Sequence, residues 1–415
     1  MTMEGHANAT LIVGGGVAAS EAAFALRRNG FAGPITIIGD EPHPPYQRPP
    51  LSKAYLAGEV GLGSLHAKPA AAYEKAGIAV ASSTRVDAID AAGQQIVLSD
   101  GRVLRYDKLV LALGGRARTL SALLPDVPAH LVNLHAVRTI SDVDRLRAQL
   151  APGRRMVIIG GGYLGLEFAS VAIRLGLKVC VLEFLPRVLA RVAAPQVSSF
   201  FEQVHRESGV DVRTGVQVNG FETESGLIRS VVCADGEAVP ADVVIGGVGM
   251  IPNTELAQAA GLVVADGIVV DAASRTSDPH IFAIGDCANA PSAVSGERMR
   301  LESVPNALDQ ARVAGAAICG KDMPRRNVPW FWSDQYDLKL QIAGISRGHH
   351  DTVVRGSIRE RRFSVLYVKG DRLVAADVVN CPADFSGARD LIFRGTPVDM
   401  ARIADASVPL AALAA

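Results

Sequence analysis

The sequence predicts an α/β protein in which two domains with central parallel sheets are accompanied by a third, C-terminal α+β domain. Two observations carry this prediction. A strand, glycine-turn, helix, strand unit occurs twice, at residues 10–40 and 156–183, and several strand-like segments follow residue 326. The length agrees, because 415 residues give two or three domains at about 150 residues per domain.

The first unit opens with a β-branched strand that leads into a G-x-G-x-x-A turn. Its expected parts are the strand Thr10–Val13, the turn Gly14-Gly15-Gly16-Val17-Ala18-Ala19, a helix over Ser20–Asn29 and a strand over Pro34–Ile38. In this context Gly14 permits a tight turn, and Gly16 lets a pyrophosphate approach the backbone at the helix N-terminus. Asp40 follows the second strand, where an acid can accept a ribose hydroxyl. The unit therefore predicts a dinucleotide-binding turn.

The same order of elements recurs in the middle of the chain. Its expected parts are the strand Met156–Ile159, the turn Gly160-Gly161-Gly162-Tyr163-Leu164-Gly165, a helix to Leu175 and a strand over Lys178–Leu182. Glu183 then stands 23 residues after Gly160, where an acid binds the ribose diol and repels a 2′-phosphate. This favours NADH over NADPH, although Arg187 and Arg191 follow closely. One such turn alone could be an ordinary tight turn, but two complete units predict two dinucleotides.

Composition excludes other classes of protein. Lys plus Arg and Asp plus Glu both number 42, which argues against a generic nucleic-acid binder. The first ten residues lack the features of a signal peptide, and charges interrupt the longest apolar stretch, Met156–Leu182, so we expect a soluble, cytoplasmic protein without a membrane span. The five cysteines are scattered, without a metal-type cluster, and none precedes Cys180.

Four further segments resemble a known family. They are Pro45–Lys53, Leu109–Gly115, Val243–Asn253 and Thr276–Asp286. With them the chain resembles the FAD-dependent pyridine nucleotide reductases that contain two Rossmann-like domains, although Leu113 stands where the family commonly has Thr. The resemblance implies an FAD-binding domain of residues 1–115 and 250–325, interrupted by an NAD-binding domain of residues 116–249 and followed by a C-terminal domain of residues 326–415.

The resemblance also implies the cofactors, FAD and NADH, and the residues that bind them. The FAD residues would be Gly14, Gly16, Val17, Ala18, Asp40, Arg48, Lys53, Val86, Arg138, Asp286, Val304 and Trp332. The NAD residues would be Gly160, Gly162, Tyr163, Leu164, Gly165, Glu183, Arg191 and Gly249. Asp286 would bind the ribityl chain, whereas Arg48 could also be a surface charge. Lys53 would lie beside the flavin N5 and pair with Glu167, and these two residues are the candidate catalytic pair.

The lack of cysteines before Cys180 indicates where the electrons go after they leave the flavin. Disulfide reductases of this family place thiols beside the flavin, before the position of Lys53, and this chain has none there. The segment Pro329–Tyr336 and the remaining chain resemble ferredoxin reductases of bacterial oxygenase systems, of the putidaredoxin reductase type. This implies a [2Fe–2S] ferredoxin as partner, with Arg312 and Arg389 as docking cations, and an oxygenase beyond it, a cytochrome P450 in the closest relatives.

Two alternatives stay open. One is an NADH-dependent reductase of a small acceptor, such as a quinone or monodehydroascorbate. The other is a flavin-bearing NADH sensor. We further expect a monomer or weak dimer, core packing for Trp330, and solvated side chains for His349 and His350, which stand in a polar loop. A helix is expected to open at Leu301, and the C-terminal strand-like segments are Lys339–Ile342, Thr352–Val354, Phe363–Val368 and Leu373–Val379.

Overall fold

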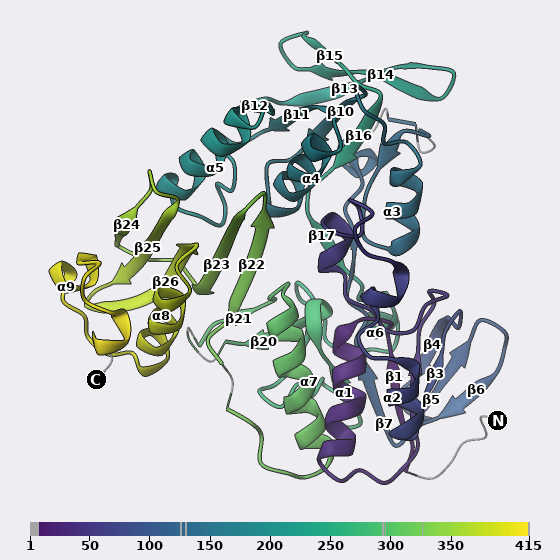
Figure 1. Ribbon diagram of the computed structural model, residues 1–415. Helices are drawn as coiled ribbons and strands as arrows, with labels where there is room; N and C mark the ends of the chain where they lie inside the picture. The colour runs from purple at the N-terminus through teal and green to yellow at the C-terminus, as the bar shows by residue number, and fades with distance from the viewer. Residues whose placement is uncertain are drawn as a thin grey trace. The chain divides into compact units, whose positions relative to one another are not determined.

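The structure, a computed structural model, describes residues 8–124, 127–128, 131–292, 294, 296–325 and 327–413. The chain forms two compact units (Figure 1). The first unit comprises Met1–Arg48, Leu62–Arg116 and Ile251–Pro329, and the second comprises Pro49–Gly61, Ala117–Met250 and Trp330–Ala415. The three-domain division stays a prediction; residue 326, its last internal boundary, and the chain end at 415 lie outside the described residues. Within the described ranges, no helix is both long and apolar enough to cross a membrane.

A five-stranded parallel sheet forms the core of the first unit, in the order β19-β7-β1-β2-β3. Its strands are β1 (Thr10–Val13), β2 (Ile35–Ile38), β3 (Ile78–Ala81), β7 (Lys108–Leu111) and β19 (Ile281–Ala283). They are nearly continuous apolar runs, as expected for a parallel sheet that is covered on both faces. The connections change direction at β1, and ligands bind at the carboxyl end of such a strand. The turn that begins at Gly14 lies at this position.

Helices cover one face of this sheet. Helices α1 (Val17–Arg28) and α7 (Val304–Ile318) lie side by side (Figure 1), so close that a Cβ on Gly315 would stand 2.7 Å from that of Ala25. Helix α7 begins at Val304 rather than Leu301, because the Ser303 hydroxyl accepts the Asn306 amide as an N-cap. Helix α1 begins at Val17 rather than Ser20, with Gly16 as its N-cap.

Antiparallel strands add to the apolar core on the other face. One sheet consists of β4 (Val86–Asp90), β5 (Gln95–Leu98) and β6 (Val103–Arg105), and another of β18 (Ile268–Val269), β20 (Ala288–Pro291) and β21 (Arg298–Met299), in which β18 pairs parallel to β20. The short helices are α2 (Ala70–Lys75), α6 (Glu255–Ala259), η2 (Leu62–Leu65) and η4 (Gly285–Cys287). The first unit is therefore a three-layer α/β structure.

The second unit contains its own parallel sheet, in the order β12-β11-β10-β16-β9. Its strands are β9 (Leu134–His135), β10 (Arg155–Ile159), β11 (Lys178–Glu183), β12 (Asp211–Thr214) and β16 (Val243–Gly246). Helices α3 (Ile140–Arg147), α4 (Tyr163–Arg174) and α5 (Pro195–Glu207) accompany it, with a small antiparallel sheet of β13 (Val218–Glu224), β14 (Leu227–Cys233) and β15 (Ala238–Pro240). The second glycine turn follows the central strand β10. The two units thus repeat one architecture.

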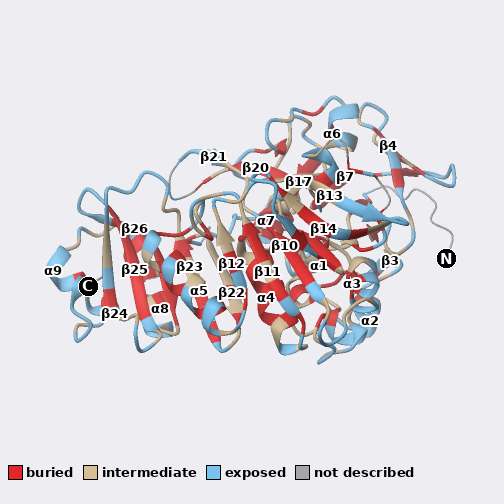
Figure 2. Cartoon of the chain, turned by 90° about the horizontal axis from the view of Figure 1, so that it is seen from above, coloured by how far each residue is buried: buried red, intermediate tan, exposed pale blue. Residues whose placement is uncertain are grey.

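An antiparallel sheet completes the second unit, in the order β22-β23-β26-β25-β24. Its strands are β22 (Trp330–Gln335), β23 (Leu338–Gly344), β24 (Asp351–Ser357), β25 (Arg362–Lys369) and β26 (Arg372–Val379), and its helices are α8 (Pro382–Arg394), α9 (Met400–Ala404) and η5 (Leu410–Leu413). Strands β25 and β26 are almost entirely buried (Figure 2). The remaining short elements are η1 (Pro49–Ser52), η3 (Leu120–Ala122), β8 (Gly115–Ala117) and β17 (Met250–Pro252). The predicted α/β class with a C-terminal α+β region is confirmed.

Candidate functional site

The first glycine turn has the geometry of a phosphate cradle. Gly14 adopts φ +136°, and a Cβ there would stand 2.1 Å from the Ala112 carbonyl oxygen, so only glycine fits. No atom lies within 4 Å of a Cβ built on Gly16, which leaves space in front of helix α1. The first amides of α1, from Val17 and Ala18 onward, receive no side-chain cap from Gly16. Uncapped amides at a helix N-terminus fit the pyrophosphate of a dinucleotide.

A charged cluster lies beside this turn. The Arg48 guanidinium donates to Glu41 Oε1 (2.9 Å) and to the Tyr46 hydroxyl (2.8 Å), and that hydroxyl donates to Glu41 Oε2 (2.7 Å). Burial alone would lower the pKa of Arg48, but Tyr46, Glu41 and Asp286 raise it above its ordinary value. Arg48 is therefore a partly buried, paired cation rather than a solvated surface charge. Glu41 was not predicted from the sequence, whereas Asp40, the expected ribose acceptor, is exposed just after the strand.

The other FAD candidates of the first unit lie at element ends. Asp286 belongs to the one-turn helix η4, which the Gln310 side chain holds by accepting the Gly285 amide at 2.7 Å. Val86 begins strand β4 and is buried, and Val304 begins helix α7. The remaining candidates, Lys53, Arg138 and Trp332, belong to the second unit.

The second glycine turn has two positions at which only glycine fits. Gly160 adopts φ +112° and would place a Cβ 2.5 Å from the Gly247 carbonyl oxygen. A Cβ on Gly165 would stand 2.1 Å from the Gly160 oxygen, so this helix approaches its strand more closely than a methyl group allows. Gly162 faces open space and caps helix α4, before Tyr163 and Leu164, without a side-chain hydrogen bond. This turn fits a second dinucleotide.

Glu183 is held by the backbone around this turn. Its two carboxylate oxygens accept the amides of Gly161 (2.6 Å) and Leu185 (2.8 Å). Of the two nearby cations, Arg187 turns inward and donates to the Ser198 hydroxyl and to backbone carbonyls, whereas Arg191 is exposed. Arg191 is thus the cation that remains accessible beside the acid. Gly249, the last NAD candidate, adopts φ +104°, and its carbonyl accepts the Arg118 amide.

The candidate catalytic pair forms within the second unit. Lys53 follows η1, and its Nζ lies 2.9 Å from Oε1 of Glu167, one turn into α4. Glu167 is only 4% exposed, and a buried carboxylate needs partners. Ser52 donates to its Oε2 at 2.6 Å, and Ser333, on β22, donates to its Oε1 at 2.7 Å. Neither serine was predicted from the sequence, because they lie 115 and 166 positions from Glu167.

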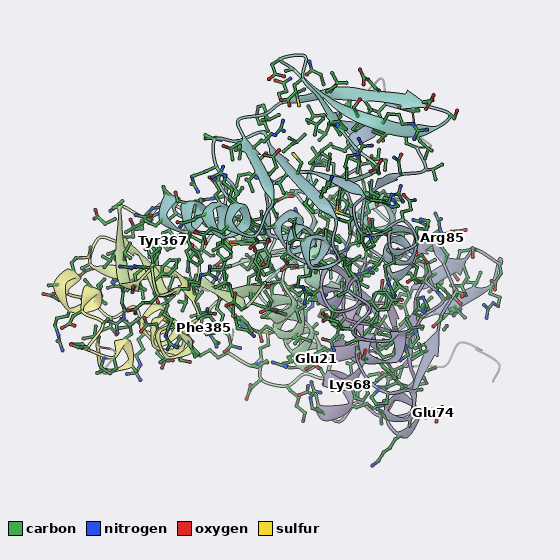
Figure 3. The ribbon with its side chains drawn as sticks, turned by 45° about the horizontal axis from the view of Figure 1, so that its top comes forward. Glu21, Lys68, Glu74, Arg85, Tyr367 and Phe385 are labelled. Atoms are coloured by element: carbon green, nitrogen blue, oxygen red, sulfur yellow. The ribbon has the colours of Figure 1, made fainter. Side chains whose placement is uncertain are left out.

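Aromatic side chains surround strand β22. The Trp332 ring stacks obliquely on Trp330 at 5.5 Å, and the ring of Tyr163, at the start of α4, lies 5.1 Å from that of Phe331. Trp330 also contacts Phe385 of α8, labelled in Figure 3, and is half-buried, so the expected core packing holds in part. The second glycine turn and the aromatic strand therefore belong to one compact unit.

The two candidate docking cations are already engaged. Arg312 lies 2.8 Å from Glu21, which belongs to α1 (Figure 3), and 3.5 Å from Asp309. The Arg389 guanidinium stands over the rings of Phe385 and Trp330, at 5.5 and 5.9 Å. The Arg138 backbone amide donates to Asp142 near the start of α3. His349 and His350 are exposed, as expected.

No thiol is poised for chemistry among the cysteines, all of which lie in described ranges. All five are free, and none precedes Cys180. Burial raises the pKa of Cys287 to about 11 and that of Cys180 to about 12, so both stay protonated at neutral pH. Dithiol chemistry beside a flavin is therefore absent from this chain.

Comparisons with known proteins agree with this geometry. Residues 8–311 match the family described as pyridine nucleotide-disulphide oxidoreductase, and residues 330–414 match the reductase C-terminal domain. Putidaredoxin reductase CamA of Pseudomonas putida is 48% identical over 96% of this chain and 95% of its own length. The solved covalent putidaredoxin reductase–putidaredoxin complex superposes with a TM-score of 0.94 at 46% identity, covering 98% of both chains.

A second solved structure is similar over its whole length. The ferredoxin reductase for the CYP199A2 system from Rhodopseudomonas palustris has a TM-score of 0.94 at 42% identity and covers 99% of this chain and 100% of its own. The chain therefore belongs to the pyridine nucleotide-disulphide oxidoreductase family, within its branch of FAD-dependent, NADH-oxidising ferredoxin reductases.

Proposed function

We propose that the protein is an FAD-dependent NADH:ferredoxin oxidoreductase. It takes the two electrons of NADH as a hydride and passes them singly to a [2Fe–2S] ferredoxin, which feeds an oxygenase, a cytochrome P450. FAD supplies the step between the two, because a bound flavin accepts electron pairs and releases single electrons. The observation that carries the proposal is the ion pair of Lys53 with the buried Glu167, in a chain with two dinucleotide turns and no thiol in its first 179 residues.

We assign the FAD pyrophosphate to the turn at Gly14 and Gly16, with Val17 and Ala18 donating backbone amides. Arg48 balances phosphate or adenosine charge, and Asp40 accepts from the adenosine ribose. Asp286 binds the ribityl chain. Val86, Arg138, Val304 and Trp332 complete the FAD contacts. The paired state of Arg48 supports its place, because a cation held by Glu41 and Tyr46 is fixed in orientation.

We assign NADH to the second turn. Gly160, Gly162, Tyr163, Leu164 and Gly165 bind its pyrophosphate, Glu183 its adenosine ribose, and Arg191 and Gly249 complete the contacts. Glu183 supports a preference for NADH, because its carboxylate, fixed by two backbone amides, cannot turn away from a 2′-phosphate.

Within the second unit, Lys53 and Glu167 carry the chemistry of the hydride step. The Lys53 ammonium, beside the flavin N5, would stabilise the negative charge of the reduced flavin. Glu167 accepts from the nicotinamide carboxamide and keeps Lys53 in place. Burial of the carboxylate strengthens both interactions, because little water competes for it.

The acceptor of the flavin's electrons is a partner protein rather than a cysteine of this chain. Ferredoxins of this kind are acidic, so cations steer their approach. We assign Arg312 and Arg389 to this docking surface. Glu21 and Asp309 reduce the net charge near Arg312, which makes Arg389 the stronger candidate. A cytoplasmic location and a monomeric or weakly dimeric state stay predictions.

A steady-state assay tests the proposed function. The FAD-loaded protein is given NADH with a [2Fe–2S] ferredoxin encoded in the same genome, and in parallel with a quinone and with monodehydroascorbate. We expect turnover to be fastest with the ferredoxin. Faster turnover with a small acceptor would favour the first alternative, and flavin reduction without turnover on any acceptor would favour the NADH sensor.

A further inference from the structure

Glu167 is the inner end of a chain of hydrogen bonds that runs through the second unit. The links are Tyr336 Oη to His205 Nδ1 (2.9 Å), His205 Nε2 to Gln335 Oε1 (2.9 Å), Gln335 Nε2 to Ser333 Oγ (3.1 Å) and Ser333 Oγ to Glu167 Oε1 (2.7 Å). Ser333 and Gln335 belong to β22 and His205 to α5. This series of hydrogen bonds therefore links the antiparallel sheet to helix α5, beside the parallel sheet of the second unit. It ends on the carboxylate that pairs with Lys53.

The donor and acceptor of each hydrogen bond follow from Glu167, because an ionised carboxylate can only accept. The Glu167 carboxylate accepts from Ser333, so Ser333 must accept from the Gln335 amide nitrogen. The Gln335 oxygen then accepts from Nε2–H of His205, and a neutral ring has Nδ1 left to accept from Tyr336. Burial lowers the pKa of His205, which agrees with the neutral ring. Each member thus donates toward Glu167 and accepts from the next residue outward.

The middle of the chain is sealed from water. His205 is fully buried, and Ser333 and Gln335 are each 1% exposed. A buried group that loses its partner is left unsatisfied, so the links depend on one another. The outer end is also constrained: Tyr336 adopts φ +55°, uncommon for a tyrosine, and its ring stacks on His205 at 5.0 Å.

The chain cannot serve as a proton path. Gln335 donates from its nitrogen and accepts at its oxygen, and an amide passes a proton between these atoms only through a high-energy tautomer. We propose that Ser333, Gln335 and His205 are positioning residues that fix the Glu167 carboxylate against Lys53 for the hydride step. This inference rests on the proposed function, because it concerns the same pair.

The test compares variants of the FAD-loaded protein by stopped-flow bleaching of the flavin over a range of NADH concentrations. Ser333→Ala removes the donor to Glu167. Ser364→Ala is the matched control, a fully buried serine of β25 that donates to Asp384 at 2.9 Å instead. We expect Ser333→Ala to slow flavin reduction at saturating NADH by about tenfold, since a lost charge-assisted bond is of this size. Ser364→Ala should lower thermal stability similarly and leave that rate unchanged.

Gln335→Met then separates positioning from general destabilisation. It leaves the Ser333–Glu167 bond in place and removes the support behind it, so a smaller loss of rate is expected. In a Ser333→Ala background the same change should have no further effect on the rate, because the link to Glu167 is already broken.

Three outcomes would overturn the inference. One is equal hydride-transfer rates in Ser333→Ala and Ser364→Ala, and another is additive effects of Ser333→Ala and Gln335→Met. If Ser333→Ala does not retain FAD, Gln335→Met alone decides, and an unchanged rate contradicts the inference. A wild-type protein that does not pass electrons from NADH to ferredoxin would instead contradict the proposed function, which the wild-type control measures separately.

Discussion

The interiors of the two units differ in their titratable side chains. Among the described residues, the buried polar side chains of the first unit are all uncharged: Thr10, Ser20, Ser274, Asn289, Ser292 and Gln310. The second unit buries Glu167, Arg355 and Asp377, together with His135 and His205. Burying a charge costs several kcal/mol unless partners offset it. The two units share one sheet architecture, so the fold itself does not require these charges.

The two units therefore offer different groups to a ligand. The first unit offers backbone amides and a partly buried, paired cation, which suits a cofactor that stays bound. The second unit pairs the partly exposed Lys53 with the buried carboxylate of Glu167, and this is the pair that we propose for the hydride step. The buried cation of this unit, Arg355, is structural among the described residues: it donates to both Asp384 oxygens and to the Val408 carbonyl, which holds the C-terminal segment against the sheet.

The largest expected effect comes from placing a methyl group in each glycine turn, because the two turns should lose different cofactors. Gly14→Ala should yield protein without FAD, because the new Cβ collides with the Ala112 carbonyl. Gly160→Ala should retain FAD but bind NADH at least about tenfold more weakly. Flavin absorbance of the purified variants and the apparent KM for NADH measure this. Loss of FAD from Gly160→Ala would reverse the assignment of the turns.

The next prediction compares a buried with an exposed ion pair on helix α4. Lys53→Met leaves Glu167 buried without its cation, and should slow flavin reduction by about a hundredfold and lower the free energy of unfolding by about 3 kcal/mol. Arg174→Met breaks the exposed pair with Glu59, formed at 3.0 Å, and should change neither by a measurable amount. Stopped-flow rates and urea unfolding test both. Equal effects would mean that the buried pair has no special role.

A smaller effect is expected for cofactor choice. Glu183→Ala removes the carboxylate that faces a 2′-phosphate, and should reduce the ratio of kcat/KM for NADH over NADPH by about tenfold. Asp40→Ala, at the matching position of the first unit, should leave that ratio unchanged even if FAD binds less tightly. If the ratio changed in Asp40→Ala and not in Glu183→Ala, NADH would bind at the first glycine turn, which would contradict the assignment.

The last comparison concerns how stability depends on pH. Burial raises the pKa of Asp377 from its ordinary 3.8 to about 7. Between these values the folded protein holds a proton that the unfolded chain releases, so stability falls as pH rises through this window and then levels off. Asp377→Asn has no carboxyl to titrate, so its free energy of unfolding should not show this fall. Its stability relative to wild type should therefore increase from pH 4 to pH 7.

A partly buried acid in the same unit, Asp242, should behave in the opposite sense. Arg155 holds the pKa of Asp242 down to about 2, so its contribution to stability is present above pH 4 and is lost as pH falls toward 2. Thermal unfolding across pH checks both slopes. A wild-type protein whose stability relative to Asp377→Asn does not change with pH would contradict the buried, protonated carboxyl.

The sequence alone predicted what local patterns encode. Both turns, their strands and Glu183 follow from spacing, and the Lys53–Glu167 pair followed from resemblance. Ser52 and Ser333 were missed because nothing local marks a serine as the partner of a distant carboxylate. Trp330–Gln335 read as an aromatic segment, yet it forms strand β22, whose alternate residues include Ser333 and Gln335. Arg187 and Arg191 look alike in sequence, and only the fold shows which one is accessible.

Electron counting tests the central claim most directly. A catalytic amount of the FAD-loaded protein is mixed without oxygen with oxidised [2Fe–2S] ferredoxin, and NADH is added in small portions. The account predicts that each NADH consumed reduces two ferredoxins, seen as bleaching of the iron–sulfur absorbance. NADH that reduces the flavin while the ferredoxin stays oxidised, with electrons passing only to an added quinone, would contradict it.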